Sequence, residues 1–161
     1  MDKINIREAQ TSDFHALHNL YTVVDRLHHQ ALPEHFKPAS DIKKRDSYLK
    51  GLLADKSNTI LVAEIQNQVI GFAHAKFGTI DHPVLNSYIS GHISDVVVDP
   101  DFERRGVGKK LLFAVERWLK EHGAIEVGLT VFCFNNEAIS FYQKNGFSNR
   151  HCNMVKSLAQ K

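Results

Sequence analysis

Two glycines, Gly106 and Gly108, stand between a run of three valines and a segment with amphipathic helical spacing. This order predicts a strand, a glycine turn and a helix N-terminus within residues 96–113. The first helical turn has N–H groups without intrahelical partners, and its dipole favours negative charge. Glycine has no Cβ, so the backbone can approach a ligand closely. Phosphate or pyrophosphate is the ligand that this chemistry favours, although another anion or no ligand also fits so short a pattern.

Two familiar phosphate-binding motifs are excluded at this place. A P-loop needs Ser or Thr after its lysine, and here Lys109 is followed by Lys110. A dinucleotide-binding fingerprint needs a third glycine three residues after Gly108, where this chain has Leu111. The segment RRGVGK at residues 104–109, which follows a hydrophobic strand, therefore belongs to neither motif.

A second block with chemical potential spans residues 135–147, NNEAISFYQKNGF. Ala138 and Tyr142 are four residues apart, so they share one face of a predicted helix. Gly146 suits the left-handed residue that ends a helix, and Phe147 begins the next predicted segment. The block therefore places one phenol on a short helix about thirty residues after the glycine turn.

Together the two blocks resemble the GCN5-related N-acetyltransferase (GNAT) family. The first is similar to the pyrophosphate-binding motif Q/R-x-x-G-x-G/A of that family, with Glu103 in place of the opening Gln or Arg. The second is similar to its motif N-x-x-A-x-x-L/F-Y-x-K-x-G-F, which is matched here at Asn135, Ala138, Phe141, Tyr142, Lys144, Gly146 and Phe147. The order of predicted elements matches over nearly the whole chain, and the specific matches fall within residues 91–147.

The resemblance implies that acetyl-CoA is the acetyl donor and that no metal takes part. It implies that the pantetheine arm pairs with the strand at Val96, Val97 and Val98, as an added strand pairs with a sheet edge. It also implies that the pyrophosphate lies on backbone amides of the glycine turn, at Arg104, Arg105, Gly106, Val107, Gly108 and Lys109. Asn135, Ala138 and Tyr142 complete the implied cofactor-binding set.

The second block has a catalytic interpretation and a structural one. By resemblance Tyr142 is the general acid that protonates the departing CoA thiolate, since a phenol of pKa about 10 can donate to a nascent thiolate. The alternative is an aromatic core residue at ordinary helical spacing. Asn135 is implied to bond the pantetheine, and its alternative is an ordinary helix N-cap.

The acceptor amine must lose a proton before it attacks, because a lysine-like ammonium of pKa about 10.4 is charged at neutral pH. The base is expected on the strand at residues 91–98. Strict alternation puts His92 and Ser94 on one face and Ile93 and Asp95 on the other. Many relatives have Glu at the Ser94 position, so Asp95 and His92 are the candidate bases here. A structural role for Asp95 is equally open.

Acceptor specificity is expected from the first helix–loop–helix and from residues 78–90. His28, His29, Phe36 and Ser94 are the candidate substrate-binding residues. His15 and His18 are three residues apart on a predicted helix, but no third ligand follows at a recognisable spacing, so a metal site is not expected.

The predicted fold is α/β: a GNAT-like single domain over residues 1–161, with a mixed, mostly antiparallel sheet of six to seven strands flanked by about four helices. Helices are expected at residues 14–27, 41–54, 106–121 and 135–145. Strands are expected at residues 4–6, 59–65, 69–75, 91–98, 125–134 and 147–157, with a loop at residues 78–90.

Bulk properties are those of an ordinary cytoplasmic domain: 161 residues, 43% hydrophobic and 24% charged. No apolar run is long enough to span a bilayer, residues 1–10 lack the apolar core of a secretory signal, and Cys133 and Cys152 make no disulfide framework. A net charge of +2 does not support nucleic-acid binding through residues 104–110. The leading hypothesis is direct acetyl transfer to a primary amine of a small molecule or peptide, and the resemblance allows a homodimer. The alternative is a catalytically weak CoA-binding sensor or regulatory module.

Overall fold

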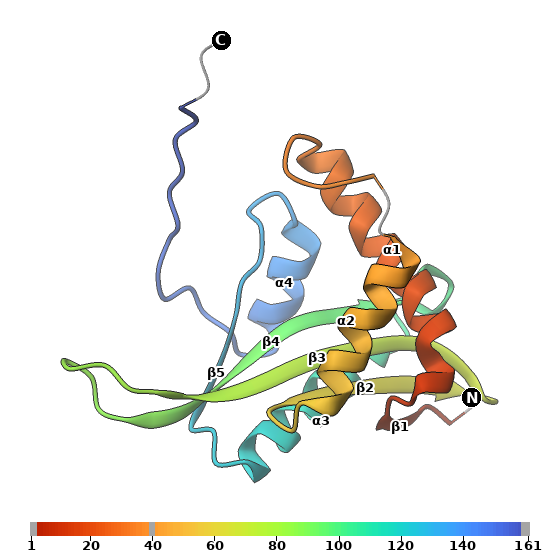
Figure 1. Ribbon diagram of the computed structural model, residues 1–161, viewed down its shortest axis with the longest axis horizontal. Helices are drawn as coiled ribbons and strands as arrows, with labels where there is room; N and C mark the ends of the chain where they lie inside the picture. The colour runs from red at the N-terminus through yellow and green to blue at the C-terminus, as the bar shows by residue number, and fades with distance from the viewer. Residues whose placement is uncertain (1–2, 39–40, 159–161) are drawn as a thin grey trace. The chain divides into compact units, whose positions relative to one another are not determined.

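A computed structural model describes residues 3–38 and 41–158 of the chain, which form two compact units, Met1–Thr130 and Val131–Lys161. Most of the regular structure belongs to the first unit (Figure 1). The elements, in chain order, are β1 (Asn5–Glu8), η1 (Thr11–Asp13), α1 (Phe14–Ala31), α2 (Ile42–Ala54), β2 (Asn58–Ile65), β3 (Gln68–Ile80), β4 (Tyr88–Val98), η2 (Pro100–Phe102), α3 (Val107–Glu121), β5 (Glu126–Leu129) and, in the second unit, α4 (Asn136–Lys144).

One mixed sheet forms the centre of the first unit, with strand order β1-β2-β3-β4-β5. The first four strands pair antiparallel, and β5 runs parallel to β4. The α/β class, the mixed sheet and four α-helices are as predicted. The prediction of six to seven strands was wrong, because the sheet has five strands over the residues that the structure describes.

Strand boundaries differ from the prediction in three places. The expected loop at residues 78–90 shrinks to residues 81–87, because the β3–β4 ladder continues through Gly78↔Ser90 and Ile80↔Tyr88. The expected strand at residues 125–134 is limited to β5, and the rings of Phe132 and Phe134 stack 5.5 Å apart beyond its end. Residues 148–158 form no strand; this stretch is mainly polar and contains a single β-branched residue, so its strand propensity is low.

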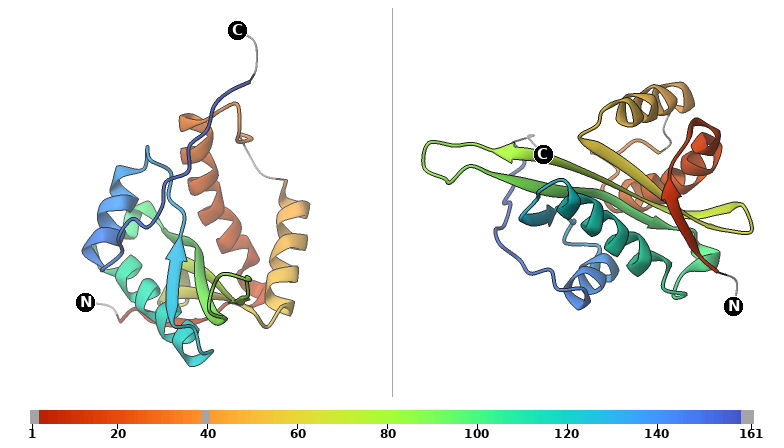
Figure 2. Two further views of the ribbon diagram at one scale, coloured as in Figure 1. Left: turned by 90° about the vertical axis from the view of Figure 1, so that its left-hand side faces the viewer. Right: turned by 90° about the horizontal axis from the view of Figure 1, so that it is seen from below.

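Helices cover both faces of the sheet, with α1 and α2 on one side and α3 on the other (Figure 2). On the first side α1 and α2 bury an apolar cluster against the sheet, which includes Leu17, Leu20, Tyr21, Leu49, Ile60, Val62, Phe72 and Val97. Full burial of one such side chain contributes roughly 1.5–3 kcal/mol.

Two glycines allow close packing on the α3 side. A Cβ at Gly71 would lie 2.7 Å from the carbonyl oxygen of Val97, and a Cβ at Gly91 would lie 2.6 Å from Cδ1 of Leu119. Either contact is shorter than van der Waals separation, so a larger residue would push α3 or β4 away. The helix that follows the glycine turn is therefore held against the strand that precedes it.

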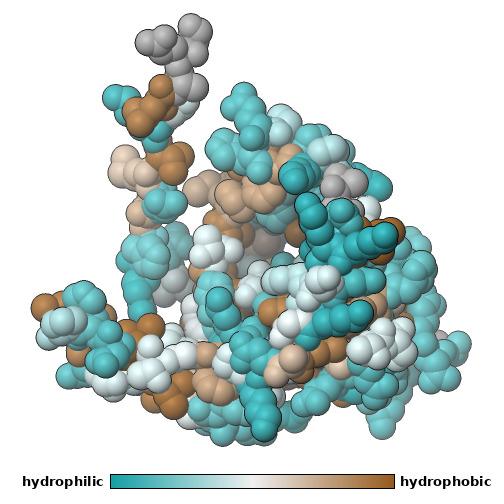
Figure 3. Space-filling model, in the orientation of Figure 1, coloured by the Kyte–Doolittle hydropathy of each residue, from teal (hydrophilic) through white to brown (hydrophobic). Residues whose placement is uncertain are grey.

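The second unit contains α4 and the segment that follows it. Hydrophobic side chains along that segment, Met154, Val155 and Leu158, are 87–89% exposed. Brown, hydrophobic atoms are visible along this segment in Figure 3. Cys133 and Cys152 are free, exposed thiols. Within the described parts of the chain, no helix combines the length and apolar character that a bilayer span requires.

Candidate active site

A β-bulge in β4 rearranges the residues expected to do acid–base chemistry. His74 on β3 pairs with Asp95, but the next residue, Ala75, pairs with Ile93, so Ser94 is skipped. His92 then pairs with Lys76, which lies two residues from His74 and on the same face of β3. The extra residue therefore brings His92 and Asp95 to one face of the sheet. The prediction that alternation separates them was wrong, since a bulge breaks strict alternation.

The carboxylate of Asp95 lies on the α1–α2 face and contacts two elements of the core. The Tyr21 hydroxyl of α1 donates to Oδ2 of Asp95 at 3.3 Å. On the neighbouring strand, Nδ1 of His74 lies 3.7 Å from the same oxygen. Burial, followed by the Asp95 charge, raises the pKa of Tyr21 far above its usual range, so this phenol remains a donor.

An arginine from α2 covers this polar group. The Arg45 guanidinium lies 4.1 Å from the centre of the Tyr21 ring and pairs with Asp25 at 2.6 Å. Burial and the Asp95 charge also raise the pKa of Tyr48. The cluster of Tyr21, Arg45, Tyr48, His74 and Asp95, here called the Asp95 cluster, thus joins α1, α2, β3 and β4. The sequence analysis did not assign Tyr21, Arg45 or His74 to the site, because their spacing shows only core and surface patterns.

His92 is half-buried beside this cluster. Burial lowers its pKa, the charges of Lys76 and His74 lower it further, and Asp95 acts in the opposite direction. A histidine with a lowered pKa is neutral at pH 7 and has a free lone pair. His92 therefore keeps the chemistry of a candidate base.

The glycine turn has the conformation that an anion-binding loop needs. Asp99 accepts from the N–H of Asp101 at 3.0 Å and begins η2. Arg104 and Gly106 both have left-handed backbones, with φ of 58° and 79°, and α3 begins directly after them. Such turns expose successive N–H groups on one concave side.

The first helical bond of α3 runs from the N–H of Lys110 to the carbonyl of Gly106 at 3.1 Å. The N–H groups of Val107, Gly108 and Lys109 precede it and have no intrahelical acceptor. Residues 103–106 are exposed, and nothing lies within 4 Å of the Cβ position of Gly106. The cations lie along neighbouring rings: Arg105 is 5.1 Å from the ring centre of Phe102, and Lys109 is 5.3 Å from that of Phe113.

The strand leading into this loop is paired on one side. Val96, Val97 and Val98 pair with β3. On the opposite side β5 pairs with β4 as far as Ile93↔Leu129, and over the described residues no strand pairs there with residues 94–98. β4 thus offers a free main-chain edge that ends at the glycine turn, and such an edge can accept an added strand.

In the second unit, α4 carries the remaining cofactor-binding candidates. Asn135 is the N-cap, and its side chain accepts from the N–H of Ala138 at 3.0 Å. Tyr142 contacts the rings of Phe141 and Phe147 at centroid distances of 5.2 and 5.5 Å. Gly146 has φ of 94°, as the helix-ending glycine was predicted to have. Tyr142 is half-buried and packs against aromatic rings of this unit, and its role as the acid stays a prediction.

The candidate substrate-binding residues His28, His29 and Phe36 lie together at the C-terminal end of α1. Nδ1 of His29 lies 2.7 Å from the carbonyl of Phe36, and the rings of His28 and Phe36 are 4.9 Å apart. These contacts tie the loop after α1 to the helix. The fourth candidate, Ser94, is exposed at the bulge of β4.

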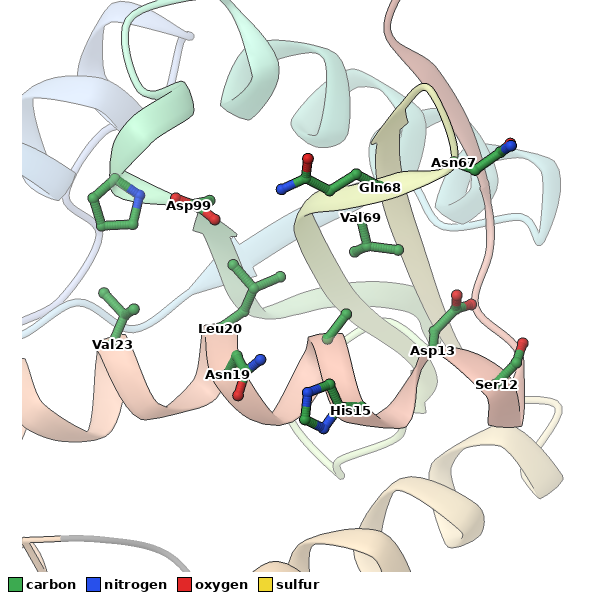
Figure 4. A pocket seen from close by; sticks show the side chains of 12 residues that line it. Ser12, Asp13, His15, Asn19, Leu20, Val23, Asn67, Gln68, Val69 and Asp99 are labelled. Atoms are coloured by element: carbon green, nitrogen blue, oxygen red, sulfur yellow. The ribbon is translucent and has the colours of Figure 1, made fainter.

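A pocket of about 540 Å³ lies elsewhere, between α1, the β2–β3 turn and the end of β4 (Figure 4). Its lining includes His15, Asn19, Gln68 and Asp99, and it contains neither the glycine turn nor the Asp95 cluster.

The predicted site residues thus fall into two groups. The residues of β4 and of the glycine turn lie together in the first unit. Asn135, Ala138 and Tyr142 lie together on α4 and its N-cap in the second unit.

Comparisons with known proteins identify the chain's relatives. The model of the acetyltransferase (GNAT) family matches residues 15–147. The uncharacterized N-acetyltransferase YhfO of Bacillus subtilis is 29% identical over 147 residues, which cover 89% of each protein. A crystal structure of a mutant BH1408 protein of Bacillus halodurans has the same fold, with a TM-score of 0.88 at 22% identity over 96% of this chain and 99% of that one. The aminoglycoside N-acetyltransferase AAC(6')-Iy in complex with CoA gives a TM-score of 0.76 at 20% identity over 99% of this chain and 97% of that one. The chain is therefore an acyltransferase that belongs to the acetyltransferase (GNAT) family.

Proposed function

We propose that this protein moves the acetyl group of acetyl-CoA directly to a primary amine of a small molecule or peptide. The observation that carries the proposal is a pair of neighbouring main-chain sites in the first unit: the edge of β4 at residues 94–98, which no strand pairs among the described residues, and the N–H groups of the first turn of α3, with η2 between them. The family uses acetyl-CoA, and the structurally similar aminoglycoside N-acetyltransferase was crystallised with CoA.

The donor fits the residues present at the loop. The left-handed Arg104 and Gly106 and the open space above Gly106 leave the amides of residues 104–109 accessible to a pyrophosphate. The pantetheine arm would pair with the main chain of Val96, Val97 and Val98 as an added strand. Arg105 and Lys109 would add screened attraction from the flanks of the loop. When bound, acetyl-CoA supplies an activated thioester carbonyl.

The transfer itself needs a base, an oxyanion donor and an acid. Asp95 is the base in this proposal, and His92 on the same face is the alternative. A main-chain N–H at the Ser94 bulge would polarise the thioester carbonyl. Tyr142 would protonate the leaving thiolate, with Asn135 and Ala138 beside the cofactor at the start of α4.

The acceptor would be an amine that enters as an ammonium ion. The carboxylate of Asp95 and the exposed phenol ring of Tyr48 are groups that bind cations. His28, His29, Phe36 and Ser94 would select among such amines.

A CoA-binding sensor is the second candidate, favoured by Ser94 at the bulge and by Glu103 in the loop. Calorimetry with coenzyme A followed by thiol-release assays separates the two functions. The amine panel should cover amino sugars, polyamines, amino acids, aminoglycosides and peptide N-termini. Binding together with thiol release supports the transferase, whereas binding without release on any amine supports the sensor. An absence of binding contradicts both.

A variant pair tests the acid. Tyr142→Phe should lower turnover by about tenfold or more while coenzyme A affinity is retained, because only the phenolic proton is removed. Tyr88→Phe is the matched control: it also removes one hydroxyl, which donates to Glu126 at 3.0 Å on the strand pair β4–β5. Turnover in Tyr142→Phe that equals the wild-type value across pH would remove Tyr142 from the mechanism.

A further inference from the structure

One ring nitrogen in the core lacks a hydrogen-bond partner beside the proposed base. His74 is 2% exposed, and its Nδ1 is a buried atom without a hydrogen-bond partner. A buried polar atom left unpaired costs about 1–3 kcal/mol, so its presence calls for an explanation. Nδ1 points toward Oδ2 of Asp95, 3.7 Å away.

The neighbours of His74 determine which ring nitrogen carries the hydrogen. Asp55, the C-cap of α2, accepts from the N–H of Ser57 at 2.9 Å and from Nδ2 of Asn58 at 2.8 Å. The Asn58 amide is thereby oriented with its Nδ2 toward Asp55 and its Oδ1 toward His74. Oδ1 lies 3.0 Å from Nε2 of His74 and can only accept, so Nε2 is the donor.

It follows that Nδ1 of neutral His74 carries a lone pair, which faces Oδ2 of Asp95. Two acceptors that face each other repel, and one proton placed between them satisfies both. The pair of His74 and Asp95 can therefore share one proton between Nδ1 and the carboxylate. The hydrogen bond from Nε2 to Asn58 keeps the ring oriented with Nδ1 toward Asp95.

We infer that His74 is a positioning residue for proton removal, which receives through Asp95 the proton that the acceptor ammonium loses. The inference rests on the proposed function and names a residue that acts behind the base. It gives a reason for a buried imidazole beside Asp95.

The step balances as follows. An N–H bond of the ammonium breaks, and its proton passes to the Asp95 carboxylate and then to Nδ1 of His74. The freed amine lone pair attacks the thioester carbonyl carbon and a C–N bond forms. The nitrogen then gives its second proton to solvent as the C–S bond breaks, and the thiolate takes the Tyr142 proton. After the acetylated product leaves, the proton on His74 returns to solvent through Asp95, and solvent reprotonates Tyr142.

Charged and titratable groups surround the pair from every element packed against it. These groups are Tyr21 of α1, Arg45 and Tyr48 of α2, Asp55 before β2, Lys76 of β3 and His92 of β4. Because one proton placed between the two facing acceptors satisfies both, we expect an acid limb in the pH profile that belongs to the pair of His74 and Asp95.

Steady-state kinetics against pH test the inference. In His74→Gln, kcat should fall about tenfold or more with KM within about threefold, and the acid limb of kcat/KM should move to lower pH by about one unit or more. Asp95 then acts alone, and a lone carboxyl loses its proton at lower pH than a carboxyl–imidazole pair. His18→Gln is the matched control, since His18 on α1 also has a buried Nδ1 without a hydrogen-bond partner. If the acid limb of kcat/KM in His74→Gln stayed at its wild-type pH, with or without a fall in kcat, His74 would have a structural role only.

Nitrogen NMR of the imidazole rings gives a readout independent of activity and of the fate of the variant. At neutral pH the hydrogen should reside on Nε2 of His74, and the protonation midpoint of Nδ1 should fall in Asp95→Asn, because the carboxylate that favours imidazolium is gone. A hydrogen on Nδ1, or a midpoint that does not move, overturns the inference. Failure of wild-type protein to bind coenzyme A would instead contradict the proposed function. Active wild-type protein with an unshifted His74→Gln profile would contradict this inference alone.

Discussion

The glycine turn and the Asp95 cluster are built in opposite ways. Every feature of the turn comes from residues next to one another in the chain: Asp99 caps η2, and Arg104 and Gly106 take left-handed backbones before α3 begins. In the Asp95 cluster, Tyr21 and Asp95 are 74 positions apart, and the other members come from α2 and β3. The proposed donor site is therefore encoded locally, whereas the proposed site of proton transfer depends on the packing of the whole first unit.

The largest effect is expected at the centre of the cluster. Asp95→Asn keeps the shape of the side chain but removes the proposed proton acceptor, so kcat should fall by about a hundredfold or more. Affinity for coenzyme A, which we propose to bind at the turn, should change less than about twofold. Thiol-release kinetics and calorimetry measure the two quantities. If the same substitution abolished coenzyme A binding, the two regions would not be separable.

The next effect concerns the anchoring of α1, which carries Tyr21. Both oxygens of Asp13 accept from the Arg7 guanidinium, at 2.7 and 3.0 Å, and Arg7 also bonds Glu64. These bonds from Arg7, followed by the bond from the Gln10 N–H, hold the pKa of Asp13 below its usual value. Asp13→Asn should lower the free energy of unfolding by about 2 kcal/mol at pH 7, since bonds to charged groups contribute about 1.5–3 kcal/mol.

The lowered pKa of Asp13 determines how its contribution to the free energy of unfolding changes with pH. The contribution of the folded Asp13 carboxylate is fully present above the unfolded pKa of about 3.9 and is lost as pH falls through the folded value. Urea unfolding should therefore separate wild type from Asp13→Asn at pH 7, and the difference should shrink progressively as pH falls below about 3.9. Glu8→Gln, an exposed position on β1, is the control and should change little across this range. A difference that does not shrink as pH falls below about 3.9 would contradict this account.

A glycine pair tests whether the turn is local. Gly106→Ala places a Cβ on a left-handed residue at a cost of about 1–2 kcal/mol, and it should weaken coenzyme A binding about tenfold. Gly51→Ala in α2 should instead raise stability by up to about 1 kcal/mol. Neither Cβ would meet an atom within 4 Å, so the pair differs in backbone conformation and not in crowding. Calorimetry and urea unfolding measure both variants; equal effects would show that φ at Gly106 is unimportant.

The smallest effect is expected at His92. His92→Gln should change kcat less than about threefold and leave the acid limb of the pH profile in place, because Asp95 is the proposed base. Kinetics against pH, with wild type in parallel, measure it. A fall of about tenfold or more would transfer the base role to His92 and place the proton path on β4 alone.

Local rules predicted much of the fold. Helical spacing found α1, α2, α3 and α4, and the polar turn between β2 and β3 was correctly placed, with Gln66 and Asn67 both at positive φ. The errors concern strand pairing. The extension of β3 and β4 through Gly78↔Ser90 and the bulge at Ser94 depend on the partner strand, which a single sequence does not reveal. Alternation therefore put His92 and Asp95 on opposite faces, where the structure has them on one.

The sequence by itself determined the family motifs, the glycine turn and the helix that follows it, because their conformations depend on φ preferences and N–H groups within a few residues. Tertiary structure decided which side chains surround Asp95 and how the His74 ring is oriented. Those contacts depend on strand register and on helices packed across a sheet face, and register is set by pairing between segments far apart in the chain.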